Sequence, residues 1–116
     1  MQYVLLIYED ERHYDDEATY KAILAAHGAF SGELAAAGKI RGGSELKSTA
    51  SATTVRQRNG QRTVHDGPWA ETAEQLGGFY LIEADDLNEA LAWAKKLPMA
   101  GDGSVEVRPL GETAEG

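Results

Sequence analysis

Apolar residues follow the two-residue period of strands in some parts of the chain and the three-to-four-residue period of helices in others. Residues 3 to 8 and 79 to 84 carry apolar side chains on both alternating faces, which is typical of strands covered on both sides. Residues 39 to 47 predict a further strand, and residues 104 to 110 alternate between valine and charged side chains. The pattern therefore predicts four strands, of which two are buried on both sides.

Two other segments carry apolar residues at helical spacing. The first begins at the aspartate pair 15 to 16, which can cap it, and runs to Gly38. The second begins at Asp86, which forms an Asp-x-x-Glu capping box with Glu89, and Pro98 ends it. The predicted apolar stripes are Tyr20, Ile23, Leu24, His27, Phe30 and Leu34 in the first helix, and Leu87, Leu91, Ala94 and Leu97 in the second.

A β-hairpin is predicted between the second and third of these strands. Residues 53 to 56 and 62 to 65 flank Arg58-Asn59-Gly60-Gln61, and Asn-Gly is a strong signal for a two-residue turn. Without the hairpin the order of elements is β-α-β-β-α-β, the split βαβ pattern of a ferredoxin-like domain.

In that topology the strands over 3 to 8 and 79 to 84 are central, and both helices cover the same face of the sheet. An isolated copy would leave Leu6, Ile82 and their neighbours facing water, and an apolar patch of that size marks an interface. We therefore predict an α+β fold: a ferredoxin-like βαββαβ protomer with an inserted β-hairpin, paired face to face in a homodimer as a dimeric α+β barrel.

Composition and charge exclude several classes of function. A chain of 116 residues predicts a single domain over residues 1–116, and its 19 acids against 11 bases give a net charge of −8. Such a surface repels phosphate backbones and anionic lipid, so we expect no nucleic-acid and no membrane partner. The N-terminal apolar run has no basic flank and is too short for a signal peptide or membrane span, which predicts a cytoplasmic protein.

No pattern in the chain is typical of a metal or cofactor site. There is no cysteine, and His13, His27 and His65 show none of the usual metal-ligand spacings. The glycine pairs match no phosphate-binding loop, so we expect neither a metal nor a cofactor. Five arginines on the strands are interpreted as cross-strand partners of the surplus acids, with an anionic ligand as the alternative: Arg41, Arg56, Arg58, Arg62 and Arg108.

The segment Asp66-Gly67-Pro68-Trp69 forces a change of direction after the hairpin. In the structural interpretation, Asp66 forms an Asx-type turn and Trp69 anchors the loop by packing. In the functional interpretation, the turn holds the Asp66 carboxylate and the Trp69 ring at the mouth of a pocket, with Gly67 and Pro68 as further ligand-binding residues. Glu71 and Glu74, just beyond, are interpreted as solvent-facing loop charges.

His27 and the small side of the first helix each have two interpretations. His27 is either a satisfied core histidine or a neutral imidazole that serves as general acid or base, with Asp66 as one candidate for its orienting carboxylate. The small side either packs closely against a partner or is simply a solvent-exposed face of small residues. That side comprises Ala22, Ala25, Gly28, Ala29, Gly32 and Ala36.

Several stretches together resemble the YCII-related proteins of the DGPF type. They are YVLLIYED, AAHGAFSGELAAAGKIRGG, DGPWAETAEQLGGFYLI, DDLNEALAWAKKLP and GSVEVRPL. The resemblance implies a bacterial, cytoplasmic, dimeric α+β barrel. It also implies an enzymatic role for the first-helix histidine, here His27, with an aspartate before a proline after the second helix. This chain has Leu97 at that position, and Trp69 replaces the phenylalanine of the signature.

Three hypotheses of function follow. The first is a small-molecule-binding dimer with His27 as acid/base, Asp66 as orienting carboxylate and Trp69 as one pocket wall. Cofactor-independent lyase, isomerase or dehydrohalogenase chemistry on a small aromatic or enolic substrate would need only such a base in a dry pocket. The second, implied by the resemblance, is a non-catalytic regulatory partner of an extracytoplasmic-function sigma factor. The third is a purely structural module.

Overall fold

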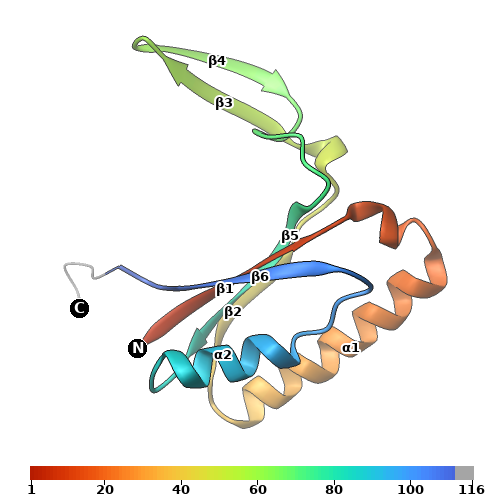
Figure 1. Ribbon diagram of the computed structural model, residues 1–116, viewed down its shortest axis with the longest axis vertical. Coiled ribbons are helices and arrows are strands. Elements are labelled where there is room, and N and C mark those ends of the chain that lie inside the picture. The colour runs from red at the N-terminus through yellow and green to blue at the C-terminus, as the bar shows by residue number, and fades with distance from the viewer. Residues whose placement is uncertain (112–116) are drawn as a thin grey trace.

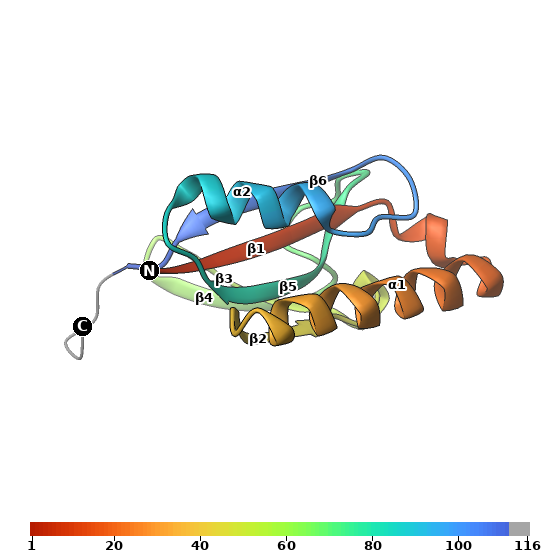
Figure 2. The same cartoon turned by 90° about the horizontal axis from the view of Figure 1, so that it is seen from below.

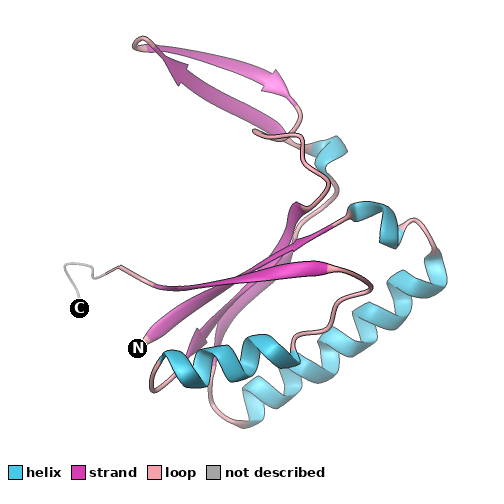
Figure 3. Ribbon diagram, in the orientation of Figure 1, coloured by secondary structure: helices cyan, strands magenta, loops and turns pink. Residues whose placement is uncertain are grey.

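A four-stranded antiparallel sheet, in the order β2-β5-β1-β6, carries both helices on one face, and a separate two-stranded hairpin, β3-β4, projects from it (Figures 1 and 3). The computed structural model describes residues 1–111. Its elements are β1 (Gln2–Glu9), η1 (Glu11–Tyr14), α1 (Glu17–Ala36), β2 (Ile40–Glu45), η2 (Thr49–Ser51), β3 (Thr53–Arg58), β4 (Gln61–Asp66), β5 (Gln75–Glu83), α2 (Leu87–Lys96) and β6 (Gly103–Pro109). The predicted βαββαβ order with an inserted hairpin, and the central places of β1 and β5, are confirmed.

The ends of α1 are set by the residues that the sequence indicated. The Asp16 carboxylate accepts a hydrogen bond from the backbone N–H of Thr19 at 3.0 Å, so it satisfies one of the free donors of the first turn. At the other end Gly38 has φ of +72°, a left-handed conformation that glycine adopts without steric cost, and it ends the helix.

Helix α2 is capped at both ends by local interactions. The Asp86 carboxylate accepts from the N–H of Glu89 at 2.9 Å, while the Glu89 carboxylate accepts from the N–H of Asp85 at 2.7 Å. The reciprocal half of the capping box therefore falls one residue earlier than predicted. Leu97 is extended because the ring of Pro98 disfavours the helical conformation in the residue before it.

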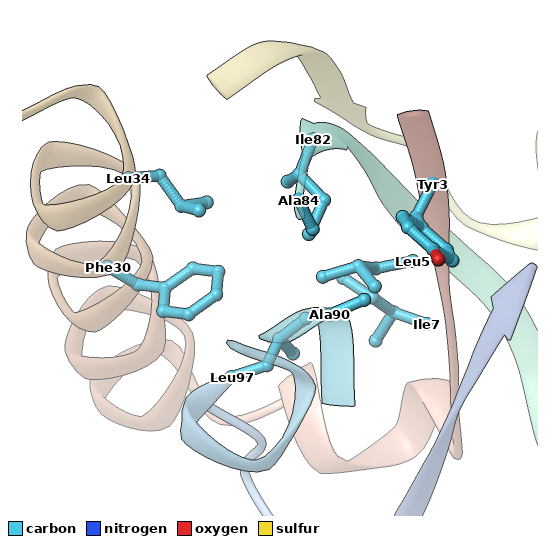
Figure 4. Close-up of a cluster of buried hydrophobic side chains, with 9 residues drawn as sticks. All are labelled: Tyr3, Leu5, Ile7, Phe30, Leu34, Ile82, Ala84, Ala90 and Leu97. Atoms are coloured by element: carbon cyan, nitrogen blue, oxygen red, sulfur yellow. The ribbon is translucent and has the colours of Figure 1, made fainter. Parts of the chain in front are cut away.

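One hydrophobic core lies between the sheet and the two helices (Figure 4). On β1 the side chains of Tyr3, Leu5 and Ile7 point toward the helices, and Ile82 on β5 lies opposite Tyr3. Both helices contribute to this core, so they cover the same sheet face, as predicted (Figure 4). Its buried members are Tyr3, Leu5, Ile7, Phe30, Leu34, Ile82, Ala84, Ala90 and Leu97.

Within residues 1–111 no helix lies over the other face of the sheet, but the residues on that face differ from the prediction. Ile82 is fully buried on the helix side, because its register with Tyr3 places it there, and the expectation that it faces water was wrong. Its neighbour Leu81 lies opposite Val4 instead. We call the uncovered side the open face, and its apolar residues are Val4, Leu6, Tyr8, Phe79 and Leu81.

The predicted helical stripes are only partly correct. In α2, Leu87 is 49% exposed and Leu91 is 38% exposed, whereas Ala90 is fully buried and Trp93 packs against the core. In α1, Leu24 is 51% exposed. Short helices offer adjacent stripes of similar spacing, and packing against the sheet selects between them, so spacing alone could not identify the buried one.

The hairpin is confirmed, and we call it the arm (residues 53–66). Asn59 and Gly60 have φ of +51° and +77°, which fits the turn that Asn-Gly favours between two strands. Val55 pairs with Val64 across the two strands. In Figure 1 the helices lie below the sheet and the arm above it, and in Figure 2, seen from below, the arm lies behind the helices. The arm therefore stands on the same side of the sheet as the open face.

Over residues 1–111, none of the helices combines the length and the apolar character that crossing a membrane would require.

Gly78 and Gly32 test the close packing of β2 on β5. A Cβ at Gly78 would lie 2.9 Å from the carbonyl oxygen of Ser44, whereas a Cβ at Gly32 would meet nothing within 4 Å. We expect Gly78→Ala to lower the free energy of unfolding by about 1–3 kcal/mol through overpacking. Gly32→Ala should raise it by up to about 1 kcal/mol through helix propensity. Urea unfolding followed by circular dichroism measures both, and an unchanged Gly78→Ala protein would contradict this β2–β5 spacing.

Candidate functional site

The helix-covered face of the sheet changes from apolar to polar at the end of β1. The alternation that buries Leu5 and Ile7 continues to Glu9, whose side chain is only 7% exposed. The Tyr14 hydroxyl donates a hydrogen bond to the Glu9 carboxylate at 2.6 Å, and the backbone N–H of Ala100 donates to the same oxygen at 3.3 Å. These donors compensate for part of the cost of burying a carboxylate.

His27 and Tyr80 form a hydrogen-bonded pair beside this acid. The imidazole Nδ1 lies 2.7 Å from the Tyr80 hydroxyl, and the two rings stack with centroids 5.8 Å apart. Phe30, one turn later in α1, packs edge-on against the Tyr80 ring at 5.2 Å. His27 is half-buried, so it lies at the boundary of the core and has a specific polar partner.

Burial and the surrounding charges set the protonation of the pair. Burial lowers the pKa of His27 below 6.5, while the charge of Glu9 and the backbone carbonyl of Pro98 raise it in part. Burial also raises the pKa of Tyr80. At neutral pH the pair is therefore a neutral imidazole and a neutral phenol. In the tautomer that carries its proton on Nε2, Nδ1 accepts the hydrogen bond from the Tyr80 hydroxyl.

A further phenol–carboxylate contact extends this region along α1. The Tyr20 hydroxyl lies 3.0 Å from the Glu45 carboxylate, and the hydrogen bond and charge of Glu45 raise the pKa of Tyr20. The Tyr14 and Tyr20 rings meet edge to face at 6.4 Å. Burial, and then the hydrogen bond to Glu9, raise the pKa of Tyr14 well above its usual value. We call the whole set the polar cluster: Glu9, Tyr14, Tyr20, His27, Glu45 and Tyr80.

The polar cluster is suited to proton transfer and to hydrogen bonding. It holds two carboxylates, three phenols and one imidazole, with no lysine or arginine among its members. Such a set disfavours an anionic ligand and favours a neutral or cationic one. Among residues 1–111, no group of three or more His, Asp or Glu side chains is arranged to hold a metal ion.

The Asp66–Trp69 turn joins the arm to the sheet and lies apart from the polar cluster. Gly67 has φ of +110°, its N–H donates to the carbonyl of Ala52 at 2.7 Å, and its own carbonyl accepts from the Thr54 hydroxyl at 2.6 Å. Both hydrogen-bond partners of Gly67 therefore lie at the start of β3. The carboxylate of Asp66 has no hydrogen-bond partner in the described part of the chain, so the predicted Asx turn is not formed.

Trp69 does not anchor the loop, because its side chain is 73% exposed. It lines a hollow of about 340 Å³ together with Leu46 and Leu76. Pro68 lines both this hollow and a second one of about 440 Å³, which also contains Glu71. Pro68 and Trp69 therefore lie at a concave surface, and their role in binding a ligand stays a prediction. Glu71 is exposed, as expected, whereas Glu74 accepts a hydrogen bond from the Ser104 hydroxyl at 3.1 Å.

The structure does not bring His27 and Asp66 together in one protomer. The side chain hydrogen-bonded to His27 is Tyr80, and no bond or ion pair between His27 and Asp66 occurs in residues 1–111. Leu97, which stands where the resemblance implies an aspartate, is buried in the core. The acids whose charges raise the pKa of His27 are Glu9 and, to a smaller extent, Glu45.

Sequence reasoning missed Glu9 and Tyr80, although one of them carried a signal. Glu9 continues the alternation of Tyr3, Leu5 and Ile7, so an acid on the buried face could have been read from the two-residue period. Tyr80 carried no such signal, because β5 is apolar on both faces. Its contact with His27 also joins residues 53 positions apart.

Two further surface features differ in how they match the predictions. The small side of α1 is exposed at Gly28 and Gly32, and a Cβ at either would meet nothing within 4 Å, so no part of the protomer approaches there. The five strand arginines are not cross-strand partners of acids. Arg108 pairs with Glu106 on its own strand. The other four form no ion pair within residues 1–111: Arg41, Arg56, Arg58 and Arg62.

Comparison with known proteins agrees with this fold and with the motifs. The family model of the YCII-related domain matches residues 1–113. An uncharacterized protein of Rhizobium meliloti (strain 1021) is 40% identical over 118 aligned positions, which cover 95% of this chain and 92% of that protein. A match over nearly the whole chain shows common ancestry and a common fold, and the chain belongs to the YCII-related family.

Proposed function

We propose that this chain binds a small molecule at the polar cluster and catalyses a proton transfer on it through His27 and Tyr80. The observation that carries the proposal is the 2.7 Å contact between Nδ1 of His27 and the Tyr80 hydroxyl, in a half-buried site beside a buried carboxylate. A neutral imidazole held by a phenol is a base that functions near neutral pH.

The pair can act as a relay. When Tyr80 takes a proton from the substrate, its own proton passes to Nδ1 of His27, so the phenol stays neutral and the charge moves to the imidazole. The charge of Glu9 favours the imidazolium that results, since it raises the pKa of His27. Glu9 is therefore proposed to stabilise this charge, whereas the sequence had suggested Asp66 as an orienting carboxylate. The proposed catalytic set is His27, Tyr80 and Glu9.

Cofactor-independent lyase, isomerase or dehydrohalogenase chemistry fits this set. Each reaction begins when one proton leaves a carbon or oxygen of the substrate, and no redox group is needed. The acidic surroundings favour a neutral enolic or phenolic substrate over a carboxylate or phosphate. Pro68 and Trp69 line the separate hollow, and Gly67 precedes them in the chain. We propose that hollow as a ligand-binding surface, because about 340 Å³ falls within the usual range for small-molecule sites.

We further propose that two copies pack open face to open face, which gives the dimeric α+β barrel. Val4, Leu6, Phe79 and Leu81 are only partly buried in one protomer, and no helix covers them. A second sheet would complete their burial, and each fully buried aliphatic side chain contributes about 1.5–3 kcal/mol.

The regulatory alternative has one supporting observation. The small side of α1, including Ala25, Gly28 and Gly32, is exposed and offers a smooth surface on the side of the sheet away from the open face. A sigma factor of the extracytoplasmic-function class that docked there would bind wild type but not Gly28→Glu, as measured by calorimetry. Binding that survives Gly28→Glu would count against this alternative.

A ligand screen separates the catalytic proposal from the others. Thermal shifts with a library of small enols, phenols and halogenated aromatics should reveal ligands that stabilise wild type. We expect such ligands to lose at least about tenfold in affinity with His27→Ala or Tyr80→Phe, because each change removes one member of the pair. Tyr3→Phe is the matched control, since it removes a phenol that lies outside the polar cluster and bonds to Met1. Ligands that bind all four proteins equally would refute a role for the pair.

The low pKa of His27 predicts a specific pH dependence of stability. Its value is below 6.5 in the folded state, so between the two values the unfolded chain binds more protons. The stability that this histidine contributes is therefore present above about pH 6.5 and is lost as the pH falls through that value toward the folded pKa. The difference in unfolding free energy between wild type and His27→Gln should shrink from about pH 8 to about pH 5.5. A difference that grows on acidification would mean that burial does not control this imidazole.

Leu6→Glu tests the open-face dimer. The change places a charge in the centre of the open face, so sedimentation velocity should show a folded monomer where wild type sediments as a dimer. Leu24→Glu is the control, because Leu24 is 51% exposed on the helix side and should leave the assembly unchanged. A wild-type monomer at high micromolar concentration, or a dimer that tolerates Leu6→Glu, would exclude this interface.

A further inference from the structure

The arm has no hydrophobic core of its own in the protomer. Every residue of β4 is exposed, and the cross-strand valine pair is left in water, with Val55 63% exposed and Val64 68% exposed. An isolated two-stranded hairpin is at best marginally stable in water. The valine pair therefore contributes little to stability unless another surface covers it.

The dimensions of the chain lead to the same conclusion. Its radius of gyration is 16.0 Å, compared with about 13 Å for a compact domain of this length, and it measures 44 × 44 × 18 Å. The excess comes from the arm, which projects beyond the sheet and both helices (Figure 1). In a monomer, 14 of the 116 residues would lie away from the core and would add no buried apolar area to it.

The charge of the arm indicates what it contacts. Residues 53–66 contain three arginines and one acid, whereas the remainder of the chain has eight bases and 18 acids. None of the arginines Arg56, Arg58 and Arg62 forms an ion pair within the described residues. The arm is thus a basic element on an acidic protein, and the surface complementary to it is the body of this same chain.

The position of the arm makes a second copy, and not its own body, the accessible partner. The arm stands on the open-face side of the sheet (Figures 1 and 2), where a second protomer would sit in the open-face dimer. A body seated on that face lies next to the arm, and two-fold symmetry makes the contact reciprocal.

We infer that the arm clasps the body of a second copy, so that the Val55–Val64 pair is covered and Arg58 and Arg62 face acidic residues of that copy. The inference rests on the open-face dimer proposed above, and it adds a second contact that is distant from the sheets. The clasp buries apolar area on the arm and pairs cations that are otherwise unpaired, so it should slow dissociation.

Crosslinking between copies tests the clasp directly. The chain has no cysteine, so Thr63→Cys, exposed on the arm, can carry a single benzophenone label. Labelled light-isotope protein is mixed with unlabelled heavy-isotope protein, irradiated and analysed by mass spectrometry. We expect light–heavy crosslinked peptides from residue 63. The control is the same label on Ala25→Cys, exposed on the helix side, which should give no light–heavy product.

Charge and apolar variants measure the contribution of the clasp. Arg58→Gln and Lys95→Gln each remove one exposed cation that has no ion pair among the described residues, one on the arm and one on α2. We expect Arg58→Gln to weaken the dimer about threefold and to reduce its sensitivity to salt, while Lys95→Gln has no effect. Val55→Thr with Val64→Thr keeps the strand propensity and should weaken the dimer further.

The outcomes distinguish the clasp from the dimer on which it rests. If wild type is a dimer that Leu6→Glu dissociates, yet residue 63 gives no light–heavy product, the clasp is wrong and the open-face dimer stands. If Leu6→Glu still sediments as a stable dimer and still gives the light–heavy products, the arm contact stands and the open-face dimer is wrong. A monomeric wild type refutes both. An arm that binds a short DNA duplex through Arg58, with no light–heavy product, would identify a nucleic acid as its partner and overturn the inference.

Discussion

The central strands β1 and β5 carry apolar side chains on both faces, and the two α-helices formed by residues 1–111 both lie on one of these faces. Leu5 and Ile82 are fully buried beneath the helices, while Leu6 and Leu81 are covered only in part. Since hydrophobic stabilisation follows the area removed from water, the open face contributes only part of what its composition allows. The remaining elements are arranged around this asymmetry: the core and polar cluster lie on the covered side, and the arm lies on the other.

The polar cluster is located where the apolar core ends. Along β1 the two-residue period presents Glu9 to the helices after Ile7, and a carboxylate at that depth requires donors. Tyr14 and the N–H of Ala100 supply them, and the charge that they stabilise acts in turn on His27. The same alternation that builds the core thus places a charge next to a titratable imidazole. This explains why proton chemistry is concentrated at one end of the covered face.

Local signals in the sequence predicted what is determined locally, and failed where register decides. Asp16, Gly38 and the Asn-Gly turn act through their own backbone neighbours, so their roles could be read from the sequence. The facing of Ile82 could not, because a strand that is apolar on both faces contains no information about which face the helices cover. The His27–Tyr80 contact depends on how α1 lies across β5, which no spacing encodes.

The Asp66–Trp69 turn is explained by the arm and not by the proton chemistry. Gly67 adopts a backbone conformation that side chains disfavour, and Pro68 fixes its own φ and restricts the residue before it, so the chain leaves the arm in one fixed direction. The bonds that join Gly67 to Ala52 and Thr54 tie that turn to the start of β3. An arm that contacts only solvent would not need a turn that fixes its orientation. A fixed orientation is needed when the arm must contact a surface at a defined place. The turn therefore maintains the orientation of the arm.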